Sequence, residues 1–262
     1  MPSRRGGTAR LAFRAHAGAT LRLKFQPNRR HPDVTRVAAK LRRPIRSFVH
    51  RARGLTKARE KEFSALWERY GRTVPEQEFQ PETLFDQPGP ITLEIGFGHG
   101  EVLLNEAQVC TQHNILGIEV YRPVLFSVLR KANQLELNNL RVVSGDAALL
   151  LPRFPDDCLQ QIRILFPDPW PKRRHQKRRL LQDSFLAECA RCLVPGGLLH
   201  LATDWSDYAK QIEQAVGKAA CWHIGSDLPD RPETHFEQRG RRLGHEVWER
   251  VLELKPLDTS QG

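Results

Sequence analysis

The chain has 262 residues and carries 41 Lys and Arg against 30 Asp and Glu, for a formal net charge of +11. This length suffices for one α/β domain with a full core and an appendage, whereas five cysteines are too few for a disulfide scaffold. No apolar run approaches the roughly 20 residues needed to cross a bilayer, so we expect a cytoplasmic protein with no membrane partner.

Positive charge is concentrated near the amino terminus. Residues 1–59 contain seventeen Lys and Arg and a single acid, Asp33, so this segment carries +16 and the remainder carries −5. Such a segment favours binding to a polyanion, because each phosphate that it neutralises releases condensed counterions. We expect residues 1–42 to form a basic, disordered extension, residues 43–90 an N-terminal arm with a helix, and residues 257–262 a tail.

The first regular pattern begins at Thr56. Residues 56–70 start with a potential capping threonine, place apolar side chains at helical spacing and end before Gly71, which predicts a helix. The stretch 72–90 contains four prolines, and we expect it to be a surface connection.

Strand-like and helix-like segments then alternate over residues 91–256. The expected strands are Ile91–Ile95, Asn114–Val120, Leu140–Ser144, Ile162–Phe166, Gly197–Thr203, Trp222–Ile224 and His245–Leu254. The expected helices are Glu101–Val109, Pro123–Leu137, Ala147–Arg153, Arg179–Leu193 and Ser206–Lys218. Nearly continuous apolar strands separated by helices predict an α/β domain, with a mostly parallel seven-stranded sheet covered on both faces.

A glycine-rich turn follows the first of these strands. Gly96, Gly98 and Gly100 lack side chains, so a bulky ligand could approach the backbone there. The dinucleotide fingerprint requires a third glycine where this chain has Glu101. A carboxylate at that point opposes a pyrophosphate and therefore disfavours NAD, but it tolerates a cofactor without phosphates.

Three acids lie at or near strand ends beside this turn. Glu119 is placed to accept hydrogen bonds from ribose hydroxyls, Asp146 from an adenine amino group, and Glu94 could face a positively charged amino-acid portion. The pattern shows no cation that would compensate them. The arrangement favours a cationic cofactor such as S-adenosylmethionine.

A base site is predicted after the fourth long strand. Asp168 and Trp170 are set among prolines that fix their directions. A base could stack on Trp170 while Asp168 accepts from its edge, although Trp170 could equally be a core aromatic. A second acid and aromatic pair, Asp204 and Trp205, ends the fifth strand on the same rim.

A dense run of cations follows the predicted base site. The six residues are Lys172, Arg173, Arg174, Lys177, Arg178 and Arg179. Such a run is often only a solvated helix face. Its position beside the base site makes phosphate binding the better interpretation.

Several segments carry a resemblance to a known family. They are RSFVHR (46–51), LTK (55–57), LEIGFG (93–98), GIEV (117–120), FPDPWPK (166–172) with its basic tail, TDW (203–205) and THFEQRGRRLGH (234–245). On these segments the chain resembles the bacterial tRNA (guanine-N7-)-methyltransferases from about residue 43 to residue 254. Several of the strings are specific to that family, unlike the glycine-rich turn alone.

The resemblance implies a Rossmann-like class I methyltransferase that acts on N7 of the guanine at position 46, in the variable loop of tRNA. It implies that the cofactor-side residues are Glu94, Gly96, Gly98, Glu119, Asp146 and Asp168, with Asp168 also catalytic. It implies that the substrate-side residues include Lys172, Asp204, Thr234, His235, Phe236 and Glu237. The sequence pattern adds the Trp170 ring for base stacking and, as phosphate contacts, Arg174, Lys177, Arg178 and Arg179. His235 stands where the family commonly has lysine. Either Asp168 or Asp204 could accept from the guanine edge.

Other readings stay open at this point. Adenine-N6 methylation uses an Asp-Pro-Pro-aromatic loop at the same strand end, and a non-enzymatic RNA-binding module or a nicotinamide-dependent oxidoreductase explains fewer of the residues. Cys189 and Cys192 form a Cys-x-x-Cys pair within an expected helix, but no other cysteines match a zinc spacing. We therefore expect free thiols and no metal. The sequence leaves monomer and homodimer as alternatives.

Overall fold

The computed structural model describes residues 55–76, 80–225 and 227–256. The chain divides into two units, Met1–Arg43 and Pro44–Gly262, and the described residues all belong to the second. The expected disordered extension and the tail at 257–262 lie outside the described residues, as do the first part of the expected arm and the RSFVHR segment.

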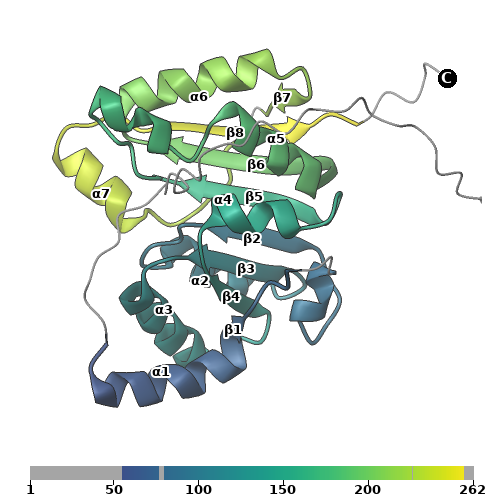
Figure 1. Cartoon of the computed structure of the whole chain (residues 1–262), viewed down its shortest axis with the longest axis vertical. Coiled ribbons are helices and arrows are strands. Elements are labelled where there is room, and N and C mark those ends of the chain that lie inside the picture. Colours follow the sequence, from purple (N-terminus) through teal and green to yellow (C-terminus); the bar gives the residue numbers. More distant parts are fainter. Residues whose placement is uncertain (1–54, 77–79, 226, 257–262) are drawn as a thin grey trace, which may run out of the picture. The chain divides into compact units, whose positions relative to one another are not determined.

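An eight-stranded sheet forms the centre of the second unit (Figure 1). The strands are β1 (Gly71–Arg72), β2 (Ile91–Ile95), β3 (Asn114–Glu119), β4 (Leu140–Ser144), β5 (Leu159–Leu165), β6 (Leu193–Thr203), β7 (Trp222–Ile224) and β8 (Trp248–Leu254). Their order is β1-β4-β3-β2-β5-β6-β8-β7, and only the pairings of β8 with β6 and β7 are antiparallel. The expected mostly parallel sheet is confirmed.

The expected number of strands was too small by one. Gly71 and Arg72 pair in parallel with Val142 and Val143 of β4 and so add a short edge strand. Two residues are too few for a period-2 pattern to be recognised in a sequence. The connection that follows is not confined to the surface either, because Val74, Leu84 and Phe85 are buried in the core.

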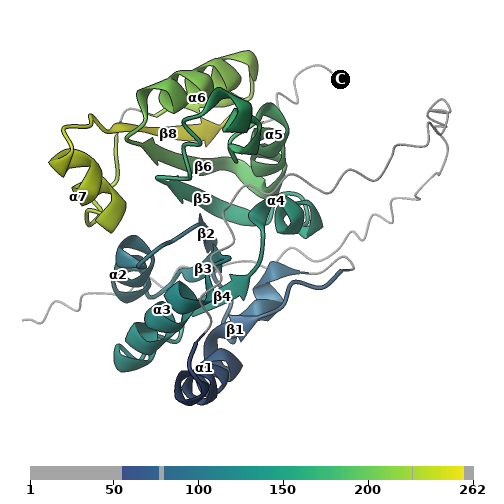
Figure 2. The same ribbon diagram turned by 60° about the vertical axis from the view of Figure 1, so that its left-hand side comes forward.

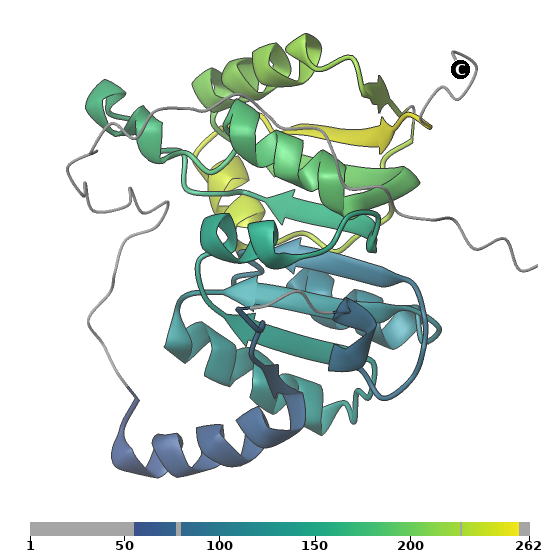
Figure 3. The same cartoon turned by 45° about the vertical axis from the view of Figure 1, so that its right-hand side comes forward.

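Helices cover both faces of the sheet (Figures 1 and 2). One face is covered by α1 (Lys57–Tyr70), α2 (Glu101–Val109) and α3 (Arg122–Gln134). The opposite face is covered by α4 (Ala147–Leu150), α5 (Asp183–Cys192) and α6 (Ser206–Lys218). Figure 3 brings the second set forward. None of the described helices is both long and apolar enough to cross a membrane.

The chain reverses its direction of sheet growth at β2. From β2 the sheet extends through β3 and β4 on one side and through β5 and β6 on the other. In such sheets, ligands bind at the carboxyl ends of the strands beside this reversal. Helix α7 (His235–Arg242) lies near that edge (Figure 2).

Helix α7 was not expected from the sequence. Its composition is strongly polar, so it shows no apolar repeat of helical period. The signal that was present is a capping box: the Thr234 hydroxyl accepts a 3.1 Å hydrogen bond from the Glu237 backbone N–H. The strand expected from His245 consequently begins later, at Trp248.

The helix expected over Arg179–Leu193 is shorter than predicted. It begins at Asp183, and the preceding cations Arg173–Arg178 form a separate 3₁₀ helix, η3. The expected helix Ala147–Arg153 likewise splits into α4 and a 3₁₀ turn at Leu151–Arg153.

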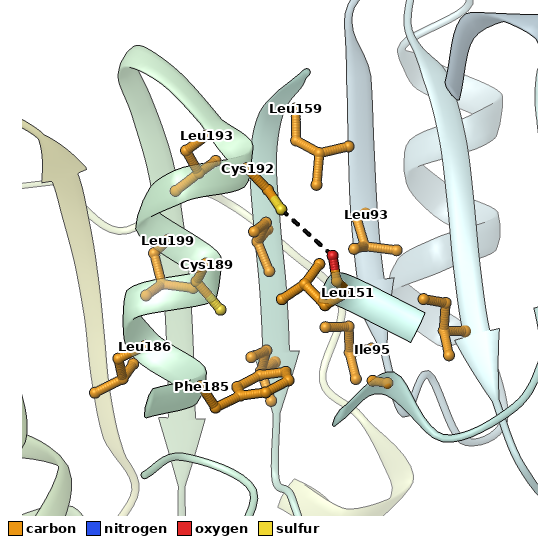
Figure 4. Packing of buried hydrophobic residues seen from close by; sticks show 14 of the residues in the cluster. Leu93, Ile95, Leu151, Leu159, Phe185, Leu186, Cys189, Cys192, Leu193 and Leu199 are labelled. Carbon is orange, nitrogen blue, oxygen red and sulfur yellow. Dashed lines mark hydrogen bonds between the residues drawn. The ribbon is translucent and has the colours of Figure 1, made fainter. Parts of the chain in front are cut away.

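The cysteine pair lies in the hydrophobic core (Figure 4). Cys189 and Cys192 are both fully buried, and the Cys192 thiol lies 3.7 Å from the carbonyl oxygen of Leu151. Burial raises the pKa of the Cys189 thiol. All five cysteines lie among the described residues and form no disulfide with one another. The described residues bring together no group of three or more His, Cys, Asp or Glu that could hold a metal ion.

Candidate active site

A cavity of about 300 Å³ opens at the carboxyl edge of the sheet. Residues that follow four neighbouring strands line it, and α7 contributes one side chain. Among the lining residues are Gly96 and Gly98 after β2, Glu119 at the end of β3, Asp146 after β4, Asp168 after β5, and Phe236 of α7. The structure thus brings together five of the six residues expected on the cofactor side.

Three carboxylates face this cavity. Glu119, Asp146 and Asp168 line it, and none of the described residues around it is a lysine or arginine. Apolar side chains such as Ile118 and Leu180 provide the remaining walls. A carboxylate-lined, largely apolar cavity favours a ligand that carries positive charge and disfavours one that carries phosphates.

The glycine-rich turn leaves room for a ligand at the cavity floor. Gly96 and Gly98 have φ angles of 70° and 51°, a region that side-chain-bearing residues rarely adopt. A Cβ atom at Gly98 would lie 3.2 Å from the ring of Phe236, whereas one at Gly96 would meet nothing within 4 Å. The turn therefore packs against α7 on one side and is open on the other.

Backbone N–H groups hold the Glu119 carboxylate in place. One oxygen accepts hydrogen bonds from Val120 and Tyr121 at 2.7 and 3.0 Å, and the other lies 3.4 Å from the Gly98 nitrogen. Burial raises the pKa of Glu119, and these backbone bonds oppose that rise. Asp146 caps α4 by accepting from the Ala148 N–H at 3.1 Å. Both acids are fixed by local structure before any ligand arrives.

Glu94 has a different environment from the one expected. It is buried behind the cavity lining, and its carboxylate pairs with Arg163 at 3.4 Å. Arg163 also pairs with Glu106 of α2. Burial raises the pKa of Glu94 to about 7, although the Arg163 guanidinium opposes that rise. The expectation that no cation compensates the charge of Glu94 was wrong. Strands β2 and β5 pair in a register that sets Arg163 directly opposite Glu94.

The loop after β5 has an unusual backbone around Asp168. Phe166 and Trp170, which flank the Pro-Asp-Pro segment, have φ angles of 52° and 44°. Such angles are uncommon for bulky residues and cost on the order of 1–3 kcal/mol each. Strain of this kind persists where the surrounding structure imposes it, and here it presents Asp168 to the cavity.

Arg179 provides part of that restraint and is not available to phosphate. Its guanidinium is buried, donates to the Pro169 carbonyl at 2.8 Å, and bonds Gln211 and Asp207 of α6 at 2.7 Å each. The expected phosphate contact at Arg179 is therefore not supported. Sequence spacing could not separate this arginine from its neighbours, because its two side-chain partners in α6 lie 28 and 32 residues away.

The remaining cations of the run lie on the surface around η3. Lys172, Arg174 and Lys177 are exposed, while Arg178 is half-buried and lies 4.9 Å from the centre of the Trp170 ring. Trp170 is itself half-buried and belongs to neither large core cluster. The Trp170 ring therefore lies outside the large core clusters, with the Arg178 guanidinium over one face.

The expected substrate-side segment at 234–237 divides between two roles. His235 is exposed and its ring lies 4.6 Å from that of His99, while Phe236 lines the cavity. Glu237 is buried and bonds Arg231 at 2.7 Å and Arg241 at 2.9 Å. A direct substrate contact by Glu237 is not supported by this geometry. Its carboxylate instead anchors the start of α7.

Asp204 lies outside the cavity lining and has its own partner. Its carboxylate is 2.8 Å from Nδ1 of His245. Neither His245 nor the α7 anchor Arg231 was identified as functional from the sequence. His245 is the last residue of segment 234–245, which carries part of the family resemblance, and Arg231 lies just before that segment. The segment was therefore the signal in the sequence that could have identified both residues.

Comparisons with known proteins show what the chain is similar to. The family described as putative methyltransferase matches residues 88–250. The tRNA (guanine-N(7)-)-methyltransferase of Nitrosococcus oceani is 43% identical over 79% of this chain and 89% of its own length. The enzyme of the same name from Halorhodospira halophila is 41% identical over 82% of this chain and 96% of its own. The crystal structure of the 16S rRNA methyltransferase KamB aligns with a TM-score of 0.49 and 17% identity, over 79% of this chain and 97% of that chain.

The identities extend over about four fifths of the chain, and the expected Rossmann-like class I methyltransferase fold is confirmed. On the strength of these matches, the chain belongs to the family of tRNA (guanine-N(7)-)-methyltransferases.

Proposed function

We propose that the protein transfers a methyl group from S-adenosylmethionine to N7 of guanine in tRNA, at position 46 in the variable loop. One observation carries the proposal: a single cavity at the sheet reversal collects three carboxylates and, within the described part of the chain, no lysine or arginine. A cationic cofactor fits that lining, whereas a dinucleotide would place its pyrophosphate near the Glu101 carboxylate.

The residues present fit S-adenosylmethionine. Glu119 stands at the end of β3 with one oxygen only weakly bonded, so it can accept from ribose hydroxyls. Asp146 lies after the next strand, where an adenine amino group can donate to it. The open space at Gly96 accommodates the amino-acid portion without a side-chain clash. When bound, the sulfonium cofactor supplies an electrophilic methyl group.

Positioning is the main demand that this reaction places on the protein. Guanine N7 already exposes an in-plane lone pair, so no base is needed to deprotonate it before attack. The protein must hold N7 close to the methyl carbon and in line with the carbon–sulfur bond. The strained Asp168 loop, tied to α6 by Arg179, provides a rigid wall for that purpose.

Carboxylates at the rim match the edge of guanine. An ionised Asp168 or Asp204 can accept hydrogen bonds from guanine N1–H and the exocyclic amine, which adenine does not offer in the same pattern. The same negative charge stabilises the positive charge that develops on the purine during methyl transfer. Asp168 lines the cavity and Asp204 does not, so we assign proximity to the reacting atoms to Asp168.

The cations of η3 are placed to bind the tRNA backbone. Lys172, Arg174 and Lys177 are exposed next to the Asp168 loop, and each phosphate contact adds to a salt-dependent affinity. Trp170 offers a ring on which a base can stack, with Arg178 on one face. We further propose that the enzyme acts in the cytoplasm as a monomer or homodimer, which sedimentation with and without tRNA distinguishes.

Radiolabelled S-adenosylmethionine and unmodified tRNA test the proposal. We expect labelled 7-methylguanosine, located in the variable loop by borohydride and aniline scission. Asp168→Asn should abolish product while tRNA affinity stays within about threefold of wild type, because phosphate contacts dominate that affinity. Asp183→Asn, at an exposed acid paired with Lys218, is the matched control and should retain activity. Label found only in N6-methyladenosine would refute the assignment in favour of exocyclic-amine methylation.

A further inference from the structure

The Asp204 carboxylate is held by residues that follow it by about forty positions. His245 Nδ1 lies 2.8 Å from one oxygen, Oδ2, and within the described part of the chain no other hydrogen bond to this carboxylate is present. A carboxylate oxygen accepts only, so the His245 Nδ1 carries the proton and donates it. This bond fixes one oxygen of Asp204 and leaves the other, Oδ1, directed elsewhere.

His245 is itself well restrained. Its backbone N–H donates to the Gly240 carbonyl at 3.0 Å, and its ring meets the Trp205 ring edge-on, with centroids 6.1 Å apart. The side chain is about one-third exposed. The backbone hydrogen bond and the contact with Trp205 together restrain the imidazole, which can therefore orient the carboxylate to which it donates.

Gly240 of α7 forms the other side of this arrangement. A Cβ atom at Gly240 would lie 2.6 Å from Asp204 Oδ2 and 3.1 Å from both the Cβ and the Cγ of Asp204. The whole Asp204 side chain, not just its tip, occupies the space that a larger residue would need. The missing side chain at Gly240 therefore allows Asp204 the rotamer that meets His245.

We propose that His245 and Gly240 are positioning residues that fix the Asp204 carboxylate for guanine recognition. His245 takes Oδ2 and orients Oδ1 to accept from the Watson–Crick edge of the target guanine. The proposal rests on the guanine-N7 methyltransferase function proposed above. It gives α7 a second task, since the same helix carries Phe236 into the cofactor cavity.

The energetic reason lies in the cost of ordering. A carboxylate that rotates freely must be immobilised when the guanine binds, and it samples orientations that offer no acceptor to the base. A charge-assisted hydrogen bond is worth about 1.5–3 kcal/mol, which corresponds to roughly a 10- to 100-fold change in kcat/KM. We therefore expect kcat/KM to fall by that factor when the hydrogen bond from His245 to Asp204 is removed.

Glycine substitutions provide the sharpest test. Gly240→Ala displaces the Asp204 side chain from its present position, although alanine is the better helix former. Gly217→Ala is the matched control, because Gly217 also lies in a helix and its added Cβ would meet nothing within 4 Å. Gly217→Ala should be as stable as wild type or more so, whereas Gly240→Ala must displace Asp204 and should lose some stability. The two activities are therefore compared well below both measured melting temperatures. Only Gly240→Ala should lower kcat/KM for tRNA, by about 10- to 100-fold.

Histidine substitutions test the hydrogen bond itself. The amide nitrogen of His245→Asn can replace Nδ1 as donor, whereas His245→Leu fills space without donating. We expect the leucine variant to lose about 10- to 100-fold in kcat/KM and the asparagine variant to recover to within about threefold of wild type. S-adenosylmethionine affinity, measured by calorimetry, should stay constant in all four variants, because Asp204 does not line the cofactor cavity.

Three outcomes would overturn the positioning role. They are equal activity of Gly240→Ala and Gly217→Ala, wild-type activity in His245→Leu, and equal losses in His245→Asn and His245→Leu accompanied by lower stability. Failure of the proposed function is distinct, since wild-type protein would then yield no 7-methylguanosine, and the inference would fall with it.

Discussion

Replacing Arg231 with methionine is expected to destabilise the protein by removing the cation shared by two buried carboxylates. The Arg231 guanidinium bonds both oxygens of Glu249 in β8, at 2.7 and 2.8 Å, and bonds Glu237 in α7 at 2.7 Å. The three side chains are 8%, 14% and 4% exposed. Methionine keeps much of the length of the side chain while removing its charge and its donors.

The expected size of the effect follows from this burial. Removing one partner of a buried ion pair costs about 3–5 kcal/mol, because the other charge is left uncompensated. Glu237 retains Arg241 and Glu249 retains His200, so the lower end, about 3 kcal/mol, applies here. At about 2–4 °C per kcal/mol for a domain of this size, the melting temperature should fall by roughly 6–12 °C.

Equilibrium urea denaturation at neutral pH measures this loss. Arg250→Met is the matched control on the same strand, because Arg250 is 45% exposed and its partner Glu213 is 3.8 Å away. That variant should lose under about 1 kcal/mol. A loss of similar size in both variants would show that the ion pairs of Arg231 with Glu237 and Glu249 do not anchor α7.

The pH dependence of the Arg231→Met effect provides a second check. Burial alone would raise the pKa of Glu249, but hydrogen bonds from His200 and Arg231 lower it to about 2. A depressed carboxylate pKa stabilises the fold above the unfolded value near 4.5 and ceases to do so as the pH falls through about 2. The difference between wild type and variant should therefore narrow in acid. A difference that is constant from neutral pH to the acid limit would contradict this account.

Three further predictions concern the site. Burial raises the pKa of Glu94 to about 7. The contribution of Glu94 to the free energy of unfolding is therefore greatest below its unfolded pKa of 4.5 and is lost as the pH rises through 7. Glu94→Gln should reduce this pH dependence of the unfolding free energy, measured by urea denaturation. Phe236→Ala should weaken S-adenosylmethionine binding by roughly fivefold in calorimetry, because about 1 kcal/mol of ring burial is lost, while Leu243→Ala, at an exposed residue just after the same helix, should not. Arg174→Ala should lower the salt dependence of tRNA binding by about one counterion without changing stability. Arg179→Ala should instead lower stability. A stable Arg179→Ala variant together with a destabilised Arg174→Ala variant would contradict both roles.

Much of the cofactor side could be predicted from sequence because it depends on local order along the chain. In a parallel sheet with alternating helices, residues after successive strands necessarily meet at one edge. Gly96, Glu119, Asp146 and Asp168 each follow an apolar run that was recognisable by composition. Their shared position around one cavity follows from topology, without any knowledge of side-chain contacts.

Roles that depend on distant partners could not be predicted in this way. Arg179 looked like one cation in a run of six, yet its buried contacts to α6 make it a restraint on the Asp168 loop. Glu94 looked like an unpaired acid, yet Arg163 on the neighbouring strand neutralises it. Charge patterns along a sequence report composition, whereas pairing depends on the order and register of strands.

Short contiguous segments encode the alternation of strands and helices, the carboxylate-rich edge of the sheet and the resemblance to the family, so these features were predictable from the sequence. The folded arrangement, in contrast, sets which charged residues are buried partners and which face the cavity. It also decided that α7 joins the cofactor cavity to Asp204, since that helix lacks an apolar repeat and is anchored by side chains of β8 and of the loop before it. Burial and long-range pairing are properties of the folded chain, and they assign each of these residues its chemistry.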